Sequence, residues 1–189
     1  MNLRNHRMDM ESQLLQDLAD ANPATFATIT RSQDGFCIVM QESPAWRGRW
    51  TERRVETEHT LRYVYPRYYP TLPLEGYFVR PILHVNVDPI TGFVCLWKNY
   101  RPGQTIVDAI LITRAIMACK VANLDPVHRM QQDVAMTPTE FCELPMPSLV
   151  IPLSCRPVLP YRNNRKRRLS PEIEDQAPEE SDFAFSDIE

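Results

Sequence analysis

The segment from Ile106 to Ala122 most constrains the fold, because nearly all of its side chains are apolar. The polar exceptions are Asp108, Thr113, Arg114 and Lys120. Thr105 and Asp108 have the spacing of a capping box, which marks the start of a helix. Residues 106–112 alone would also suit a strand, but the length of the segment, its cap and its alanines favour a helix. A helix that is apolar on all sides must be covered, so we predict a buried central helix.

Weaker patterns on both sides of this helix predict the remaining elements. A helix is expected over Asp9–Asn22, where Pro23 prevents its continuation. A second, C-terminal helix is expected from Asp125, as N-cap, to about Ala135. The other expected elements are strands at Phe36–Met40, Val55–Tyr65 and Gly76–Val79 and a loop at Ser43–Trp50. This order predicts an α+β domain with a small antiparallel sheet of about four strands, kept apart from the helices.

The C-terminal part of the chain differs in composition from the rest. Prolines recur after Thr137, at positions 138, 145, 147, 152, 157 and 160, and predict an extended segment packed on the domain. Residues 1–161 hold 16 basic and 16 acidic side chains, whereas residues 162–189 hold 5 and 8. We therefore expect one domain over 1–161 and a charged, disordered tail over 162–189. The basic cluster at 162–168 is interpreted as a solvated charge run, with anion binding or a nuclear address as the alternatives.

Charge and cysteine content exclude several classes of function. The balanced charge of residues 1–161 gives no reason to expect nucleic-acid binding. No long uncharged apolar run predicts a membrane span, and no apolar segment follows the basic N-terminus as a secretory signal would require. The five cysteines form no Cys-x-x-Cys pair, which argues against a disulfide framework and a structural zinc site. We expect a cytoplasmic protein, or a nuclear one where 162–168 acts as an address in a eukaryotic host.

A pattern of a different kind precedes the central helix. His84 and Asn86 lie two positions apart, and Cys95 follows about ten residues later between two aliphatic residues. The accompanying features are Tyr65-Pro66, Gly92-Phe93-Val94-Cys95-Leu96, Tyr100-Arg101-Pro102, Thr105-Ile106 and Asp125-Pro126-Val127. In this order, from roughly Tyr65 to Val134, they resemble the ubiquitin-conjugating (UBC) enzymes, in which a His-Pro-Asn tripeptide leads to the active-site cysteine.

The resemblance implies a UBC-like fold whose irregular loop carries a thioester. It implies that Cys95 accepts a ubiquitin or ubiquitin-like modifier from an activating enzyme and transfers it to an amine of a protein substrate, with a ligase or without one. It implies no metal or organic cofactor on this chain, because ATP is consumed upstream. Cysteine suits this task, since sulfur is nucleophilic and a thiolate leaves readily. Cys37 and Cys119 are assigned to the core.

The resemblance also implies roles for three neighbours of Cys95. Asn86 would stabilise the oxyanion with its amide N–H, and the alternative is that it only hydrogen-bonds loop backbone. Asp125 would orient the incoming lysine, and the alternative is a plain N-cap. His84 is assigned mainly to holding the loop, rather than to titrating as a base.

Two further hypotheses stay open, the first because Val85 stands where the UBC family has proline. An inactive UBC-like module would keep the fold and use its surface to bind ubiquitin or a conjugation partner. A cysteine hydrolase would pair Cys95 with His84 or His128, although no Gly-rich oxyanion motif accompanies it. The patchy pattern is similar to that of the prokaryotic relatives of the carrier enzymes, so the kind of modifier is left open.

Overall fold

A computed structural model describes residues 3–123, 125, 129–131, 134 and 143–156 of the chain. The helices are α1 (Leu3–Asp20) and α2 (Ile106–Met117), with short 3-10 turns at Trp50–Glu52 and Leu153–Cys155. The strands are β1 (Phe26–Arg31), β2 (Gly35–Met40), β3 (Ala45–Arg47), β4 (Arg54–Glu56), β5 (His59–Val64), β6 (Glu75–Phe78) and β7 (Phe93–Val94). No helix within these described ranges has both the length and the apolar character needed to cross a membrane.

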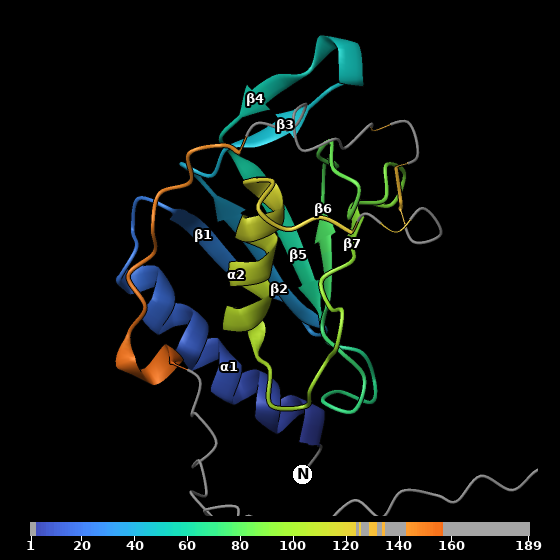
Figure 1. Cartoon of the computed structure of the whole chain (residues 1–189). Helices are drawn as coiled ribbons and strands as arrows, with labels where there is room; N and C mark the ends of the chain where they lie inside the picture. The colour runs from blue at the N-terminus through green and yellow to red at the C-terminus, as the bar shows by residue number, and fades with distance from the viewer. Residues whose placement is uncertain (1–2, 124, 126–128, 132–133, 135–142, 157–189) are drawn as a thin grey trace, which may run out of the picture. The chain divides into compact units, whose positions relative to one another are not determined.

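The main sheet is antiparallel and is packed on one face by α2 (Figure 1). Its five strands lie in the order β1-β2-β5-β6-β7, while β3 and β4 form a separate hairpin. The inward side chains of neighbouring strands meet in register, as in the Ile38–Leu61 and Leu61–Phe78 pairs, and all three side chains are buried. The Tyr63 hydroxyl donates to Thr113 on α2 over 2.9 Å, which ties the helix to the sheet. The predicted α+β class and the central helix are therefore confirmed.

The sheet has five strands rather than about four, and two regions were predicted wrongly. Phe26–Arg31 was missed because only Phe26 is fully buried, so the strand lacks the apolar alternation that marks a half-buried strand. The predicted strand Val55–Tyr65 is divided into β4 and β5, and Val55, 43% exposed, pairs with Trp46 of β3. The expected loop at Ser43–Trp50 thus contains β3.

The bounds of α1 and α2 differ from those predicted. Helix α1 begins at Leu3 rather than Asp9, because buried Met8 extends its apolar face beyond the expected stripe. Helix α2 ends at Met117 rather than near Ala122, in a Schellman motif. Cys119 there has φ = 59°, and the N–H groups of Cys119 and Lys120 donate to the carbonyls of Ile116 and Ala115. Glycine usually occupies such a left-handed position. Because this chain has cysteine there, the sequence contained no glycine that would mark the end of the helix.

Residues 143–156 form the expected extended segment along the domain (Figure 1). The Asn22 side chain holds it by donating to the Val150 carbonyl over 2.8 Å and accepting the Val150 N–H over 2.7 Å. The buried Arg114 guanidinium donates to the Pro147 carbonyl. The tail over 162–189 lies outside the described residues. So does most of the predicted helix at 125–135, and its described residues are not helical.

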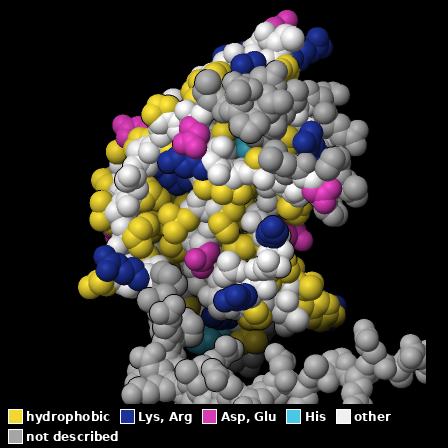
Figure 2. Space-filling view, in the orientation of Figure 1, with side chains coloured by type: hydrophobic (Ala, Val, Ile, Leu, Met, Phe, Trp, Pro, Cys, Tyr) yellow, Lys and Arg dark blue, Asp and Glu magenta, His cyan; other side chains and the backbone are white. Residues whose placement is uncertain are grey.

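The described part of the surface carries charges of both signs. On the face shown in Figure 2, basic and acidic side chains are interspersed among apolar ones rather than gathered into a single patch. Arg31 and Asp9 form an exposed ion pair at 2.5 Å that joins β1 to α1. Exposed pairs of this kind contribute little to stability.

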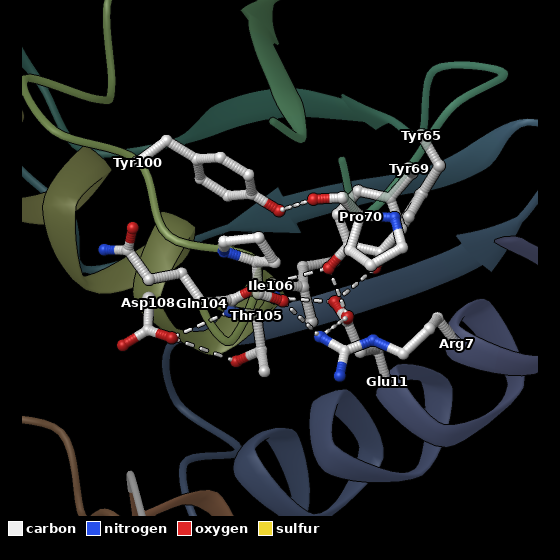
Figure 3. Close-up of polar contacts among 11 residues, drawn as sticks. Arg7, Glu11, Tyr65, Tyr69, Pro70, Tyr100, Gln104, Thr105, Ile106 and Asp108 are labelled. Carbon is white, nitrogen blue, oxygen red and sulfur yellow. Dashed lines mark hydrogen bonds and ion pairs between the residues drawn. The ribbon is translucent and has the colours of Figure 1, made fainter. Parts of the chain in front are cut away.

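A buried carboxylate joins both helices and the end of β5 (Figure 3). Glu11 of α1 is 1% exposed and accepts hydrogen bonds from the Tyr65 hydroxyl at 2.9 Å, the Tyr69 hydroxyl and the Ile106 N–H at 2.8 Å. Arg7, one turn earlier, pairs with it at 3.3 Å. Burial raises the pKa of Glu11, although the donors from Tyr69, Ile106 and Tyr65 and the charge of Arg7 oppose the shift. Ile106 is the first residue of α2, so this carboxylate also satisfies a helix N-terminus.

We predict that Glu11→Ala lowers the free energy of unfolding by about 3–5 kcal/mol, because it leaves buried donors without an acceptor. Urea denaturation followed by circular dichroism measures the change. The exposed Glu52→Ala variant serves as control and should change stability by less than about 0.5 kcal/mol. Equal stability of the two variants would contradict a central role for Glu11.

Candidate functional site

Cys95 directly follows the edge strand β7 and is partly exposed. Its N–H donates to the Asn86 carbonyl over 2.8 Å, and the preceding Val94 forms a β-bridge with Val87. Two antiparallel segments, 86–87 and 94–95, thus lie side by side. The structure therefore brings the predicted nucleophile and Asn86 together.

A β-turn over residues 84–87 places Asn86 opposite Cys95. The Val87 N–H donates to the His84 carbonyl over 2.9 Å, which closes the turn around Val85 and Asn86. His84 Nδ1 accepts the Asn86 N–H over 3.1 Å. The His84 side chain thus contacts the backbone of the turn, as expected for a residue that holds the loop.

The Asn86 side chain makes two hydrogen bonds to backbone. Its Nδ2 donates to the Cys95 carbonyl over 3.2 Å, and its Oδ1 accepts the Asn123 N–H over 2.8 Å. Asn86 is 5% exposed, so these bonds are largely shielded from water. The amide therefore lies beside Cys95 and also joins the cysteine loop to the segment that follows α2.

The tip of the loop, residues 88–92, is held by one carboxylate and one glycine. Asp88 Oδ1 accepts the N–H groups of Ile90 at 3.0 Å and Thr91 at 2.6 Å. Gly92 has φ = 74°, and a Cβ atom there would lie 2.0 Å from the Phe78 carbonyl oxygen. Only glycine fits at this position, so the glycine of the motif serves the geometry of the loop.

Burial shifts the pKa of the titratable groups around the site. It raises the pKa of the Cys95 thiol above its usual value. It lowers the pKa of His84 to about 4, against the effect of a hydrogen bond to the backbone of Val121. His84 is therefore neutral at pH 7. Burial, followed by the charge of Glu143, raises the pKa of Cys119 to about 12, so Cys119 is less reactive than Cys95.

Asp125 lies on the surface and reaches the site through one neighbour. Its N–H donates to Asn123 Oδ1 over 3.2 Å, and the Asn123 N–H in turn donates to Asn86. Asp125 is exposed, and residues 126–128, which the predicted N-cap would precede, lie outside the described residues. His128 lies outside the described residues. Among the described residues, no cluster of three or more His, Cys, Asp or Glu side chains could hold a metal ion.

Sequence reasoning missed Asn123, Met130 and Gln131, which follow α2 in the chain and contact this loop. Gln131 Nε2 donates to the carbonyls of Ile82 and Val87, each over 2.9 Å, and the Met130 N–H donates to the Val85 carbonyl over 2.9 Å. These bonds join residues that are more than 35 positions apart in the chain. No local pattern announces such contacts, because they depend on where the chain returns after the helix.

We predict that His84 makes stability fall as the pH decreases from about 6.5 to 4. The folded state binds this proton only at about pH 4, whereas the unfolded chain binds it at about pH 6.5, so acid favours unfolding. The loss assigned to His84 is of the order of 3 kcal/mol at pH 4. His84→Asn, whose Oδ1 can accept the Asn86 N–H, should flatten this part of the curve measured by urea denaturation. A curve of unchanged slope would contradict the assignment, and burial lowers the pKa of His59 as well, so some acid sensitivity should remain.

Comparison with known proteins bears on the fold. No protein-family model matches the chain, and no curated protein matches its sequence. A solved structure described as a ubiquitin conjugating enzyme from Trypanosoma cruzi matches with a TM-score of 0.50 at 18% identity, over 68% of this chain and 89% of that one. The E2 domain of a Toxoplasma gondii ubiquitin conjugating enzyme matches with a TM-score of 0.40 at 27% identity, over 57% and 74%. Human ubiquitin-conjugating enzyme E2 G1 matches with a TM-score of 0.45 at 17% identity, over 61% and 97%.

An N-terminal helix, an antiparallel sheet, an irregular loop with a cysteine and a helix across the sheet follow one another along the chain. This chain is therefore a divergent protein with the UBC fold, the fold of the ubiquitin-conjugating enzymes.

Proposed function

We propose that this protein is a carrier enzyme that holds a ubiquitin or ubiquitin-like modifier as a thioester on Cys95. The observation that carries the proposal is the reciprocal pairing of Cys95 and Asn86. The Cys95 N–H donates to the Asn86 carbonyl over 2.8 Å, and Asn86 Nδ2 donates to the Cys95 carbonyl over 3.2 Å. A partly exposed cysteine next to a fixed amide donor is what an acyl carrier requires.

The reaction consists of two acyl transfers. In the first, the Cys95 thiolate attacks the carbonyl carbon of the modifier's thioester on the activating enzyme, and the cysteine thiolate of that enzyme leaves. In the second, a substrate amine attacks the thioester on Cys95, an amide bond forms, the Cys95 thiolate leaves and the amine loses its proton to solvent or base. Each attack places a negative charge on the carbonyl oxygen of the modifier.

Asn86 is assigned to that oxygen in the second transfer, the attack of the substrate amine on the thioester at Cys95. Its amide nitrogen carries two hydrogens, and one of them is directed to the Cys95 carbonyl. The second hydrogen is the donor that we assign to the oxyanion. The bond from Asn123 to Asn86 Oδ1 at 2.8 Å fixes the orientation of the amide, so that nitrogen rather than oxygen faces Cys95.

Asp125 and His84 receive different roles. Asp125 is exposed and is linked to Asn86 through Asn123, so we assign it to attracting and orienting the substrate amine. His84 is 1% exposed, and burial lowers its pKa to about 4, so we assign it to holding the turn and not to proton transfer. The proposed partners are the modifier, an activating enzyme and a protein substrate, with a ligase or without one, in the cytoplasm.

Two observations favour a second candidate, an inactive UBC-like binding module. Both ends of the Asn86 amide already bond to backbone, and burial raises the pKa of the Cys95 thiol rather than lowering it. Such a module would bind ubiquitin or a conjugation partner without forming a thioester. Incubation with a cognate activating enzyme, modifier and ATP separates the two candidates. The carrier gives an adduct that a reducing agent removes, and the module gives none.

We predict that Cys95→Ser forms an oxyester that resists reducing agent, or no adduct at all, because an alcohol oxygen replaces the sulfur. Intact-mass spectrometry and peptide mapping locate the adduct. Cys37→Ser, which alters a partly exposed cysteine in β2, should charge as the unmodified chain does. A reducible adduct on Cys95→Ser would place the thioester elsewhere.

We predict that Asn86→Ala leaves charging within about threefold and slows discharge to free lysine by about 10²–10³-fold. Asn86→Asp keeps an oxygen for the Asn123 N–H and removes both amide donors, so its discharge should be equally slow. Single-turnover discharge of purified, charged protein measures the rate. An equal loss of charging and discharge in both variants would reduce Asn86 to a structural role.

We predict that the rate of Cys95 alkylation by iodoacetamide rises with pH and has its midpoint above the usual thiol pKa of about 8.5. Burial disfavours the thiolate and so moves the midpoint upward. Peptide mapping after short exposure should also find Cys95 modified before Cys119. A midpoint at or below pH 7 would indicate an environment that stabilises the thiolate.

A further inference from the structure

The turn that carries Asn86 lacks a strong local restraint at Val85. Val85 occupies the first central position of the turn, where proline would fix the backbone φ angle with its ring. The turn itself is closed by the Val87 N–H to the His84 carbonyl over 2.9 Å and by the Asn86 N–H to His84 Nδ1 over 3.1 Å. Both bonds are local, so they do not position the turn relative to the rest of the domain.

Gln131 supplies long-range bonds on both sides of this turn. Its Nε2 donates to the Ile82 carbonyl and to the Val87 carbonyl, each over 2.9 Å. An amide nitrogen has two hydrogens, and these two bonds use both. Ile82 precedes the turn, and Val87 is its last residue. A single side chain thus clamps the two ends of the segment that presents Asn86.

Burial makes these two bonds difficult to replace with water. Gln131 is 8% exposed, Ile82 is 2% exposed and Val87 is fully buried. A buried carbonyl that loses its donor cannot readily find another, so the free-energy cost of breaking the clamp falls on the turn.

Two described neighbours of Gln131 in the chain, Met130 and Val134, contact the same turn. The Met130 N–H donates to the Val85 carbonyl over 2.9 Å. Val134, 2% exposed, joins Leu83 and Val85 in a small hydrophobic cluster that is separate from the main core. Gln131 is therefore placed by its own neighbours, and its amide does not depend on contact with solvent.

We propose that Gln131 is a positioning residue that fixes Asn86 for the discharge of the modifier, an inference that rests on the proposed function. Gln131 acts through the backbone of residues 82–87 and contacts neither the thiol nor the modifier in the assigned reaction. Its clamp takes the place of the φ restraint that a proline at position 85 would give. The Asn86 Nδ2 to Cys95 carbonyl distance of 3.2 Å leaves little tolerance before this bond is lost. A displacement of about 1 Å at a reacting centre can slow a reaction by about 10²-fold.

The main test compares Gln131→Met with a matched control, Gln41→Met. Methionine keeps the length of the side chain and removes both donors, and Gln41 is an exposed glutamine whose Nε2 donates to Glu58. Charging of Cys95 and discharge to free lysine are measured separately, over a range of lysine concentrations. Q131M should charge within about threefold and discharge about 10²-fold more slowly at saturating lysine, whereas Q41M should match the unmodified chain. Unchanged discharge in Q131M overturns the proposal.

A second-site variant distinguishes positioning from general damage. Val85→Pro restores a rigid turn in another way, so V85P/Q131M should recover at least tenfold of the discharge rate lost in Q131M. The turn tolerates proline in principle, since the first central position of a β-turn favours it. Failure of V85P to recover any activity, in a double variant that folds, overturns the proposed mechanism. If Q131M alone does not fold, as judged by circular dichroism, discharge by V85P is compared with discharge by V85P/Q131M. If V85P/Q131M discharges less than tenfold more slowly than V85P, the result supports the proposal that proline replaces the clamp. If it discharges 10²-fold or more slowly, the proposal is overturned.

Amide hydrogen exchange provides a readout that does not depend on activity. The Val87 and Cys95 N–H groups bond to the His84 and Asn86 carbonyls, so both report on the turn. Their exchange should be at least tenfold faster in Q131M, while exchange at Ile38 in the core of β2 stays the same. Equal acceleration at all three amides indicates global destabilisation and overturns the proposal. If the unmodified chain accepts no modifier, the proposed function fails, and the exchange result alone decides whether Gln131 positions the turn.

Discussion

The buried Glu11 carboxylate fixes how the helices of this domain meet the sheet. It accepts hydrogen bonds from Tyr65 at the end of β5, from Tyr69 in the loop that follows and from the first N–H of α2. One acidic side chain thus joins segments that are separated by up to 95 positions in the chain. The bond to Ile106 fixes the position at which α2 begins. The loop between β7 and α2 must therefore connect two fixed points. The site around Cys95 lies at the start of that loop, so its geometry depends on this carboxylate.

The same segment beyond β5 also supports the loop that follows Cys95. The Trp97 indole N–H donates to the Leu74 carbonyl over 2.7 Å, and the Tyr100 hydroxyl donates to the Pro70 carbonyl over 2.9 Å. The Trp97 and Tyr100 rings contact each other edge to face. The proline-rich segment 66–74 and the loop 97–104 are therefore joined by direct hydrogen bonds near the N-terminal end of α2. Substitutions in either loop should affect the other more than they affect the turn at 84–87.

Sequence patterns predicted the features that depend on residues close together in the chain. The capping box at Thr105 is present, with the Asp108 carboxylate accepting the Thr105 N–H over 2.8 Å. The strand at Phe36–Met40 was predicted from its run of apolar residues, and it pairs with β1 and β5 on its two sides. The end of α2 was not predicted, because Cys119 adopts a left-handed conformation that the sequence gives no reason to expect. The polar edge strand β1 was missed for the same kind of reason, since its place in the sheet comes from β2 and not from its own pattern.

The candidate site shows the same division between local and long-range causes. The spacing of His84, Asn86, Gly92 and Cys95 was enough to predict that they share a loop, because each acts over a few residues. The contacts from Asn123 and Gln131 could not be predicted, since they depend on the path of the chain after α2. Val85 was visible in the sequence as a departure from the resemblance, but its consequence was not. A turn without proline needs support from elsewhere, and only the folded chain shows where that support lies.

The pKa of the Cys95 thiol determines how strongly the proposed reaction depends on stabilisation of the oxyanion. Burial raises the pKa of this thiol, so its thiolate is scarce at pH 7 but is more nucleophilic when it forms. A thiolate of higher pKa is also a poorer leaving group, which makes the proposed thioester more resistant to stray attack by water or amines. Release to a substrate amine then depends more strongly on stabilising the oxyanion of the intermediate. In the carrier that we propose, a raised thiol pKa and a rigidly held amide at Asn86 are complementary: the first keeps the modifier on the enzyme, and the second lets it leave when an amine is correctly placed.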